Sequence, residues 1–168
     1  MKPREQITRK KKIGDITYTL EYDSFRENAF IRAERDDGKY MGTLDANEVY
    51  REPFMEVKGA FAKGGRGSRV GTRMYEIMAA FACERGRVLT SDTARTDDSD
   101  GFWNKQYRKG RAVHECVVST FNRYSWMDCT PDKKKWDDEQ VLTRYRLKPC
   151  PAPTNLEGMK RRRSRRRR

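Results

Sequence analysis

Residues 64–85, GGRGSRVGTRMYEIMAAFACER, decide the fold of this chain. Their apolar side chains recur with the period of one face of an α-helix; they are Val70, Met74, Ile77, Met78 and Phe81. Ser68 stands where an N-cap is expected. The helix is therefore predicted to start at the glycine-rich turn that precedes it.

A strand is predicted directly before this turn. Residues 54–62, FMEVKGAFA, are apolar and aromatic, which is typical of a strand. The unit is therefore a strand, a glycine turn and a helix. Such a turn directs unpaired backbone N–H groups and the positive end of the helix dipole at one point, where a phosphate group would be stabilised.

The residues after the helix extend this unit to a β-α-β crossover. Gly86 supplies a C-cap, and residues 88–91 form a short buried strand. A right-handed crossover makes this strand parallel to residues 54–62, and we expect the pair at the centre of the sheet. Residues 99–109 are predicted as a second helix that packs Phe102 and Trp103 on the sheet.

The remaining strands are predicted from alternation of side chains and from turn signals. An Asp-Gly pair at residues 37–38 predicts a hairpin, and residues 45–51 are predicted as a short helical turn. A charged loop is expected at residues 128–140. The predicted strands are residues 16–22, 29–35, 39–44, 114–124 and 141–147.

The charge of the chain is concentrated at its two ends. The net charge is +13; residues 160–168, KRRRSRRRR, contribute +8, and residues 1–12 contribute the remaining +5. The body between them is therefore electrically balanced. With 168 residues and no internal repeat, we predict a basic N-terminal arm at 1–12, one domain at 13–148, and a proline-containing linker with an arginine-rich tail at 149–168.

Neither a signal peptide nor a membrane span is expected, because the N-terminus is charged and no apolar run is long enough. We expect a protein that is not secreted and is cytoplasmic or associated with nucleic acid. Cys83, Cys116, Cys129 and Cys150 lack CxxC spacing, and we interpret them as reduced thiols. His114 does not complete a known zinc motif with Cys116 and Cys129, so no metal site is predicted.

The order of these elements resembles the GCN5-related N-acetyltransferase (GNAT) family. The resemblance covers residues 16–147 in element order and is specific over residues 54–111. In that family a turn of pattern Gln/Arg-x-x-Gly-x-Gly/Ala binds the pyrophosphate of acetyl-CoA at the start of a long helix. The resemblance implies an α/β (α+β) fold with a mixed, mostly antiparallel sheet, a central parallel pair and two main helices.

The resemblance also implies a cofactor site. The pyrophosphate would be held by Arg66, Gly67, Ser68, Arg69, Val70 and Gly71, and main-chain groups near Phe61 and Lys63 would orient the acetyl thioester. Arg69 stands where the family has glycine. This residue therefore either crowds the phosphate or replaces a backbone contact with a charged one.

The family uses a tyrosine of the following helix as general acid to the departing CoA thiolate. Here Trp103 stands in its place and cannot give up that proton, which leaves Tyr107 as the candidate acid. Glu56 and Asp92 are the candidate bases that would take a proton from an amine acceptor.

Two further departures concern the acceptor side. Thr96 falls near the position of a family asparagine. Only residues 23–28 are available where the family has one or two helices that shape the acceptor cleft. The acceptor site is therefore expected to be unusually open.

The tail is predicted to bind nucleic-acid backbones or another polyanion. Arginine fits phosphates bidentately and stays charged at any relevant pH, and such binding carries no sequence information. The residues concerned are Lys160, Arg161, Arg162, Arg163, Arg165, Arg166, Arg167 and Arg168.

Two functions of different class stay open. One is an acetyl-CoA-dependent N-acetyltransferase with a nucleic-acid-binding tail. The other is a catalytically inert structural protein of the same fold that associates with DNA, such as a bacteriophage virion or internal head protein, by analogy with small acetyltransferase-like phage proteins.

Overall fold

The structure is a computed structural model, and it describes residues 2–64, 68–93, 95, 97–120 and 123–148. Its strands are β1 (Gln6–Ile13), β2 (Ile16–Asp23), β3 (Asn28–Arg35), β4 (Tyr40–Glu48), β5 (Phe54–Ala62), β6 (Val88–Thr90), β7 (Ala112–Thr120), β8 (Arg123–Asp128) and β9 (Thr143–Leu147). Its helices are α1 (Val70–Glu84), α2 (Asp97–Arg108) and α3 (Lys133–Asp138).

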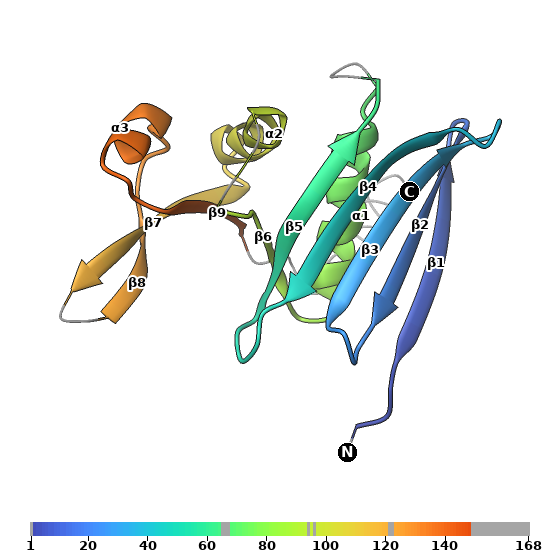
Figure 1. Cartoon of the computed structure of the whole chain (residues 1–168), viewed down its shortest axis with the longest axis horizontal. Helices are drawn as coiled ribbons and strands as arrows, with labels where there is room; N and C mark the ends of the chain where they lie inside the picture. The colour runs from blue at the N-terminus through green and yellow to red at the C-terminus, as the bar shows by residue number, and fades with distance from the viewer. Residues whose placement is uncertain (1, 65–67, 94, 96, 121–122, 149–168) are drawn as a thin grey trace, which may run out of the picture.

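In this part of the chain, nine strands form one sheet in the order β1-β2-β3-β4-β5-β6-β9-β7-β8. The β5–β6 pair is parallel, and the other neighbouring pairs are antiparallel. Figure 1 shows α1 along one face of β3, β4 and β5, and α2 beside the C-terminal strands. The mixed, mostly antiparallel sheet with a central parallel pair is confirmed.

The main core lies between α1 and the N-terminal half of the sheet. On β2 the buried Tyr18 and Leu20 alternate with the partly exposed Thr17 and Thr19, as a strand with one covered face requires. Buried side chains of α1 meet this face; they are Val70, Met74, Tyr75, Met78, Phe81 and Ala82. The predicted apolar stripe is thus confirmed except that Ile77 is only partly buried and Tyr75 joins the core.

The helix α1 begins one residue later than the predicted cap implies. Its N-cap is Arg69, whose side chain makes no capping hydrogen bond. The Ser68 hydroxyl instead donates to the Lys63 carbonyl oxygen at 3.2 Å and accepts weakly from the Val70 N–H at 3.5 Å. Gly86 follows the helix with φ +68°, as predicted for a C-cap glycine.

Four predictions of local structure are wrong. Residues 6–13 of the expected arm form β1, because the half-buried Ile7 and Ile13 anchor an otherwise polar edge strand on β2. Residues 45–48 continue β4, because the buried Ala46 pairs with β3 and β5. The single strand expected at 114–124 is the hairpin β7–β8, and the expected loop at 128–140 contains α3.

The second helix packs Trp103 on the sheet as predicted, whereas Phe102 packs on α1 instead. Trp103 is fully buried, and its ring stacks on Tyr145 of β9 with centroids 6.1 Å apart. Phe102 stacks on Tyr75 of α1 at 4.2 Å. These rings join α1, α2 and the sheet into one core. Among the described residues no helix is long and apolar enough to cross a membrane.

Candidate cofactor site

The sheet opens at the middle of β5. The parallel pairing with β6 covers only three residue pairs, from Phe54 with Val88 to Glu56 with Thr90. Beyond Thr90 the chain turns to β9, where the Ser91 N–H donates to the Tyr145 carbonyl oxygen at 2.8 Å. The rest of β5 therefore has β4 on one side and, among the described residues, no strand on the other.

Residues 58–62 are exposed as a result, although β5 lies in the middle of the sheet. Their pairing with β4 continues to Gly42, whose added Cβ would lie 2.5 Å from the Phe61 carbonyl oxygen. Three of the five residues are the small Gly59, Ala60 and Ala62. An extended ligand can thus lie along β5 and approach its backbone closely.

The glycine turn closes the far end of this opening. Gly64 has φ +90°, and a Cβ there would lie 3.0 Å from the Ser68 Cβ, so glycine is required. Gly71 lies against Ala62, because a Cβ added to Gly71 would lie 3.6 Å from the Cβ of Ala62. The predicted residues around this turn are thus brought together at the end of β5; they are Phe61, Lys63, Ser68, Arg69, Val70 and Gly71.

The positive end of the α1 dipole is not neutralised by an acidic residue in the first helical turn. The first intrahelical hydrogen bond runs from the Arg73 N–H to the Arg69 carbonyl oxygen at 3.0 Å. The N–H groups of Gly71 and Thr72 precede it and have no acceptor within the described chain. The first turn of α1 contains no acidic residue. An anion would be stabilised here by both the N–H groups and the helix dipole.

Basic residues flank the start of α1 in the chain. Lys63, Arg69 and Arg73 come from the turn and the first helical turn, and no carboxylate of the described residues pairs with them. Lys63 lies 5.9 Å over the Tyr40 ring. The charge of these side chains is therefore available to a ligand.

Arg69 takes a backbone conformation that glycine adopts without steric cost. Its φ and ψ are 57° and 7°, in the left-handed region, and its side chain is exposed. The left-handed conformation costs a non-glycine residue about 1 kcal/mol or more. The start of α1 therefore carries a guanidinium at a position whose conformation favours glycine.

Both candidate bases lie where β5 and β6 separate. Glu56 is on the face of β5 opposite the buried Met55 and Val57, with its Oε1 atom 3.1 Å from Lys58 Nζ and 27% of its side chain exposed. Asp92 follows two residues after Thr90, the partner of Glu56. One Asp92 carboxylate oxygen accepts from the Thr93 N–H at 2.6 Å.

The structure does not bring Tyr107 to this opening. Its ring packs edge-on against Tyr145, at the last turn of α2. The contacts of α2 with Tyr75 of α1 run from Ser99 to Trp103, which lie four to eight residues before Tyr107, or about 6 to 12 Å along the helix axis. The phenol at that contact is Tyr75, whose hydroxyl lies 3.1 Å from Ser99 Oγ, and burial raises the pKa of Tyr75.

Sequence reasoning missed Tyr75 as a functional candidate. The signal for it was present, because Tyr75 follows Gly71 by one helical turn and therefore lies on the side of α1 that continues the cofactor turn. No helix of the described residues lies between β2 and β3, where the family has one or two helices. Residues 24–27 form a turn, and the sheet face opposite α1 presents polar, partly or fully exposed side chains; they include Thr17, Thr19, Arg32, Thr43 and Asn47.

Several predicted residues lie outside the described part of the chain. They are Arg66, Gly67 and Thr96, together with the linker and tail at residues 149–168.

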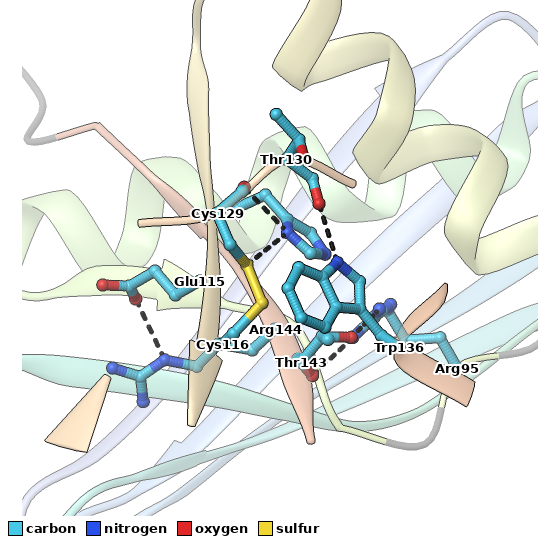
Figure 2. The surroundings of a disulfide bond; sticks show 9 residues. Arg95, Glu115, Cys116, Cys129, Thr130, Trp136, Thr143 and Arg144 are labelled. Carbon is cyan, nitrogen blue, oxygen red and sulfur yellow. Dashed lines mark hydrogen bonds and ion pairs between the residues drawn. A yellow bond between two sulfur atoms is a disulfide. The ribbon is translucent and has the colours of Figure 1, made fainter. Parts of the chain in front are cut away.

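The interpretation of the cysteines as reduced thiols is wrong for the described cysteines, because Cys83, Cys116 and Cys129 are all disulfide-bonded. Cys116 and Cys129 form a disulfide with each other, with Cα atoms 5.9 Å apart, which Figure 2 shows with its surroundings. The β7–β8 hairpin brings them together across the ladder, and His114 lies beside them. A salt bridge between Arg144 and Glu115 at 3.1 Å and a hydrogen bond from Trp136 Nε1 to the Thr130 carbonyl oxygen at 2.7 Å flank the bridge.

Comparisons with known proteins give likenesses of fold. No protein-family model and no curated protein matches the chain. Nourseothricin acetyltransferase has a TM-score of 0.48 and 18% identity over 87% of this chain and 85% of its own. A GNAT-family acetyltransferase from Staphylococcus aureus Mu50 has a TM-score of 0.46 and 13% sequence identity, over 74% of this chain and 70% of its own. Aminoglycoside 6′-N-acetyltransferase, in complex with coenzyme A, has a TM-score of 0.44 and 15% sequence identity, over 74% of this chain and 76% of its own.

At such scores and identities, the assignment of the fold rests on the chain's own topology. The sheet order, the parallel β5–β6 pair at its centre, and the turn that leads from β5 into α1 are the features that the sequence resemblance implies. The chain therefore has a GNAT-like fold.

Proposed function

We propose that the chain binds acetyl-CoA along the exposed half of β5 and transfers the acetyl group to an amine. The observation that carries this proposal is the exposure of residues 58–62 in the middle of the sheet, ending at a basic turn. A ligand that fits must be extended along β5 and anionic at the end near α1. Coenzyme A has an amide-containing arm and a pyrophosphate in that order.

Each part of this ligand has a counterpart in the chain. The N–H groups of Gly71 and Thr72 would donate to the pyrophosphate, and the guanidinium of Arg69 would add a charged contact. The backbone of β5 on its unpaired side would pair with the amides of the arm, as an added strand pairs with a sheet edge.

When bound, acetyl-CoA would supply a thioester that an amine can attack. The residues at the separation of β5 and β6 would then handle protons. Glu56 or Asp92 would take the proton that the amine loses as the C–N bond forms and the C–S bond breaks. A phenol would protonate the leaving sulfur, and Tyr75 is closer to the start of α1 than Tyr107 along the packed helices.

Isothermal titration of acetyl-CoA and CoA into the full chain tests the proposal. We expect saturable micromolar binding that is lost in the double variant Arg66→Glu, Arg69→Glu, because two repulsive charges would face the pyrophosphate. The matched control is Arg26→Glu, Arg51→Glu, which makes the same charge change in turns at the opposite ends of the strands. Replacing the eight basic residues of 160–168 by glutamine removes non-specific phosphate binding by the tail.

The absence of binding at millimolar acetyl-CoA or CoA would refute the proposal that the chain is an enzyme. The fold would then serve a structural module whose tail makes the contact with nucleic acid, which is the second candidate function. Its support is the density of charge in residues 160–168, eight basic residues in nine. Binding that survives in the double variant would instead place the cofactor elsewhere on the chain.

A further inference from the structure

A histidine and two cysteines meet on the β7–β8 hairpin. His114 and Cys116 lie two residues apart on β7 and so point to the same side of the strand. Cys129 follows β8 opposite His114, since its N–H donates to the His114 carbonyl oxygen at 2.9 Å. The ligand atoms of the three side chains all lie within 4.8 Å of one another.

The spacing of these atoms is close to that of a zinc site. With Zn–S bonds of about 2.3 Å and Zn–N bonds of about 2.0 Å, tetrahedral ligand atoms are about 3.5 to 3.8 Å apart. His114 Nδ1 already lies 3.2 Å from Cys129 Sγ. Only the two sulfur atoms are too close, because they are bonded to each other.

Breaking that bond would free the sulfur atoms to separate without unfolding the hairpin. Cys116 is fixed inside β7, where it pairs with Met127, whereas Cys129 lies just beyond the end of β8. Rotation of the Cys129 side chain can move its sulfur while the backbone hydrogen bond to His114 stays. The histidine and both thiolates would then surround one point.

Solvent reaches the histidine of this group. A cavity of about 690 Å³ between α2 and α3 has His114 in its wall, together with polar side chains that include Asp100, Asn104, Asp137 and Gln140. His114 and Cys116 are themselves almost fully buried. A metal ion can thus enter from the cavity, and water can occupy the position that the protein does not fill.

We propose that His114, Cys116 and Cys129 form a zinc-binding site when the disulfide is reduced, with solvent as the fourth ligand. Two equivalents of a thiol reductant deliver two electrons and two protons, which convert the disulfide to two thiols and leave the reductant as its own disulfide. Zn²⁺ then displaces both thiol protons and binds the thiolates and the imidazole. Oxidation reverses the sequence and releases the metal, so the disulfide and the metal exclude each other.

Cobalt titration of the full chain tests the site directly. The protein is reduced anaerobically with a phosphine, which is then removed, and Co²⁺ is added. We expect one equivalent to give the sulfur-to-cobalt charge-transfer band and the visible bands of a tetrahedral site, and the oxidised protein to give neither. The bands should be lost in Cys129→Ser and in His114→Gln, and kept in the control variant Cys83→Ser, Cys150→Ser, which retains only the proposed thiols.

A second readout keeps the proposal falsifiable if a variant fails to fold. Zn²⁺ bound to both thiolates should slow re-formation of the disulfide by oxidised glutathione at least tenfold in the reduced wild-type chain, and a chelator should restore the rate. Circular dichroism checks that each variant is folded. The proposal is overturned if reduced wild-type protein gives no cobalt bands, if the bands persist in a folded His114→Gln variant, or if zinc leaves reoxidation unchanged.

Discussion

At the scale of single residues, Arg69 combines an unfavourable backbone with a charge that the proposed function uses. Its φ of 57° lies in the left-handed region, where glycine has no steric cost. The greater conformational entropy of glycine in the unfolded chain offsets part of the relieved strain, so we expect Arg69→Gly to raise the free energy of unfolding by about 0.5 to 1 kcal/mol and to weaken CoA binding. Urea unfolding and titration measure the two effects. Arg69→Ala is the control, because it removes the charge but keeps the Cβ; equal stabilisation by both variants would contradict the assignment of strain.

Asp23 gives a residue-scale prediction about pH. A hydrogen bond from Arg4 lowers the pKa of Asp23 to about 2, which is below the value of about 3.9 in an unfolded chain. The stabilisation is therefore complete above pH 4 and is lost as the pH falls toward 2. The difference in unfolding free energy between wild type and Asp23→Asn should shrink over that range. The difference in unfolding free energy between wild type and Arg4→Gln should shrink over the same pH range. If either difference stays constant with pH, the ion pair between Arg4 and Asp23 is refuted.

At the scale of elements, the two glycines at the β4–β5–α1 junction should respond to alanine with opposite signs. A Cβ on Gly71 would make an ordinary contact at 3.6 Å with Ala62, and alanine favours helix, so Gly71→Ala should stabilise by about 0.5 to 1 kcal/mol. A Cβ on Gly42 would lie 2.5 Å from the Phe61 carbonyl oxygen, so Gly42→Ala should destabilise by about 1 to 3 kcal/mol. Thermal unfolding of both variants checks the signs, and a destabilised Gly71→Ala would show that the helix start is packed more tightly.

The unit of β5, α1 and β6 could be predicted from sequence because each element carries its own local signal. The strand has apolar residues, the helix has a 3.6-residue stripe, and Gly86 ends it. The strand β1 could not, because its lysines mask an edge strand held by two isoleucines. The sequence between β7 and β8 contains neither glycine nor proline, so the alternation of side chains predicts one continuous strand over residues 114–124.

Because the sequence does not predict the β7–β8 hairpin, it does not predict the disulfide between Cys116 and Cys129 or the position of His114 beside it. Once β7 pairs with β8, the register itself brings Cys129 to His114 and Cys116. Tyr75 is not predicted for a related reason, since its contact with Ser99 joins α1 to α2. The position of Arg69 at the turn can be predicted from local sequence, whereas a tertiary contact such as that of Tyr75 cannot.

At the scale of the whole molecule, the sheet consists of two parts that meet at three residue pairs. The meander β1 to β5 carries α1, and β7 to β9 carry α2, with β6 between them (Figure 1). A longer β6 would pair with residues 58–62 and close the proposed cofactor site. The opening is therefore a consequence of the length of β6 and of its departure to β9 at Thr90.

The distribution of charge over the whole chain predicts which end binds nucleic acid. The basic residues near the N-terminus belong to a folded region, and three of them pair with carboxylates of the body: Arg4 with Asp23, Arg9 with Glu84, and Lys12 with Asp36. The tail carries eight positive charges and contains no acidic residue from 160 to 168. We therefore expect the tail to supply most of the phosphate contacts.

Fluorescence anisotropy with duplex DNA at several salt concentrations measures this. If all eight tail charges meet phosphates, log K should fall against log salt with a slope of up to about −7. Replacing the eight residues by glutamine should remove most of that slope, whereas Lys10→Gln, Lys11→Gln on β1 should change it by about 2 at most. The salt slope reflects only the charges that contact phosphate. If the β1 variant reduces the slope more than the tail variant does, the DNA-binding surface is the edge strand β1 and not the tail.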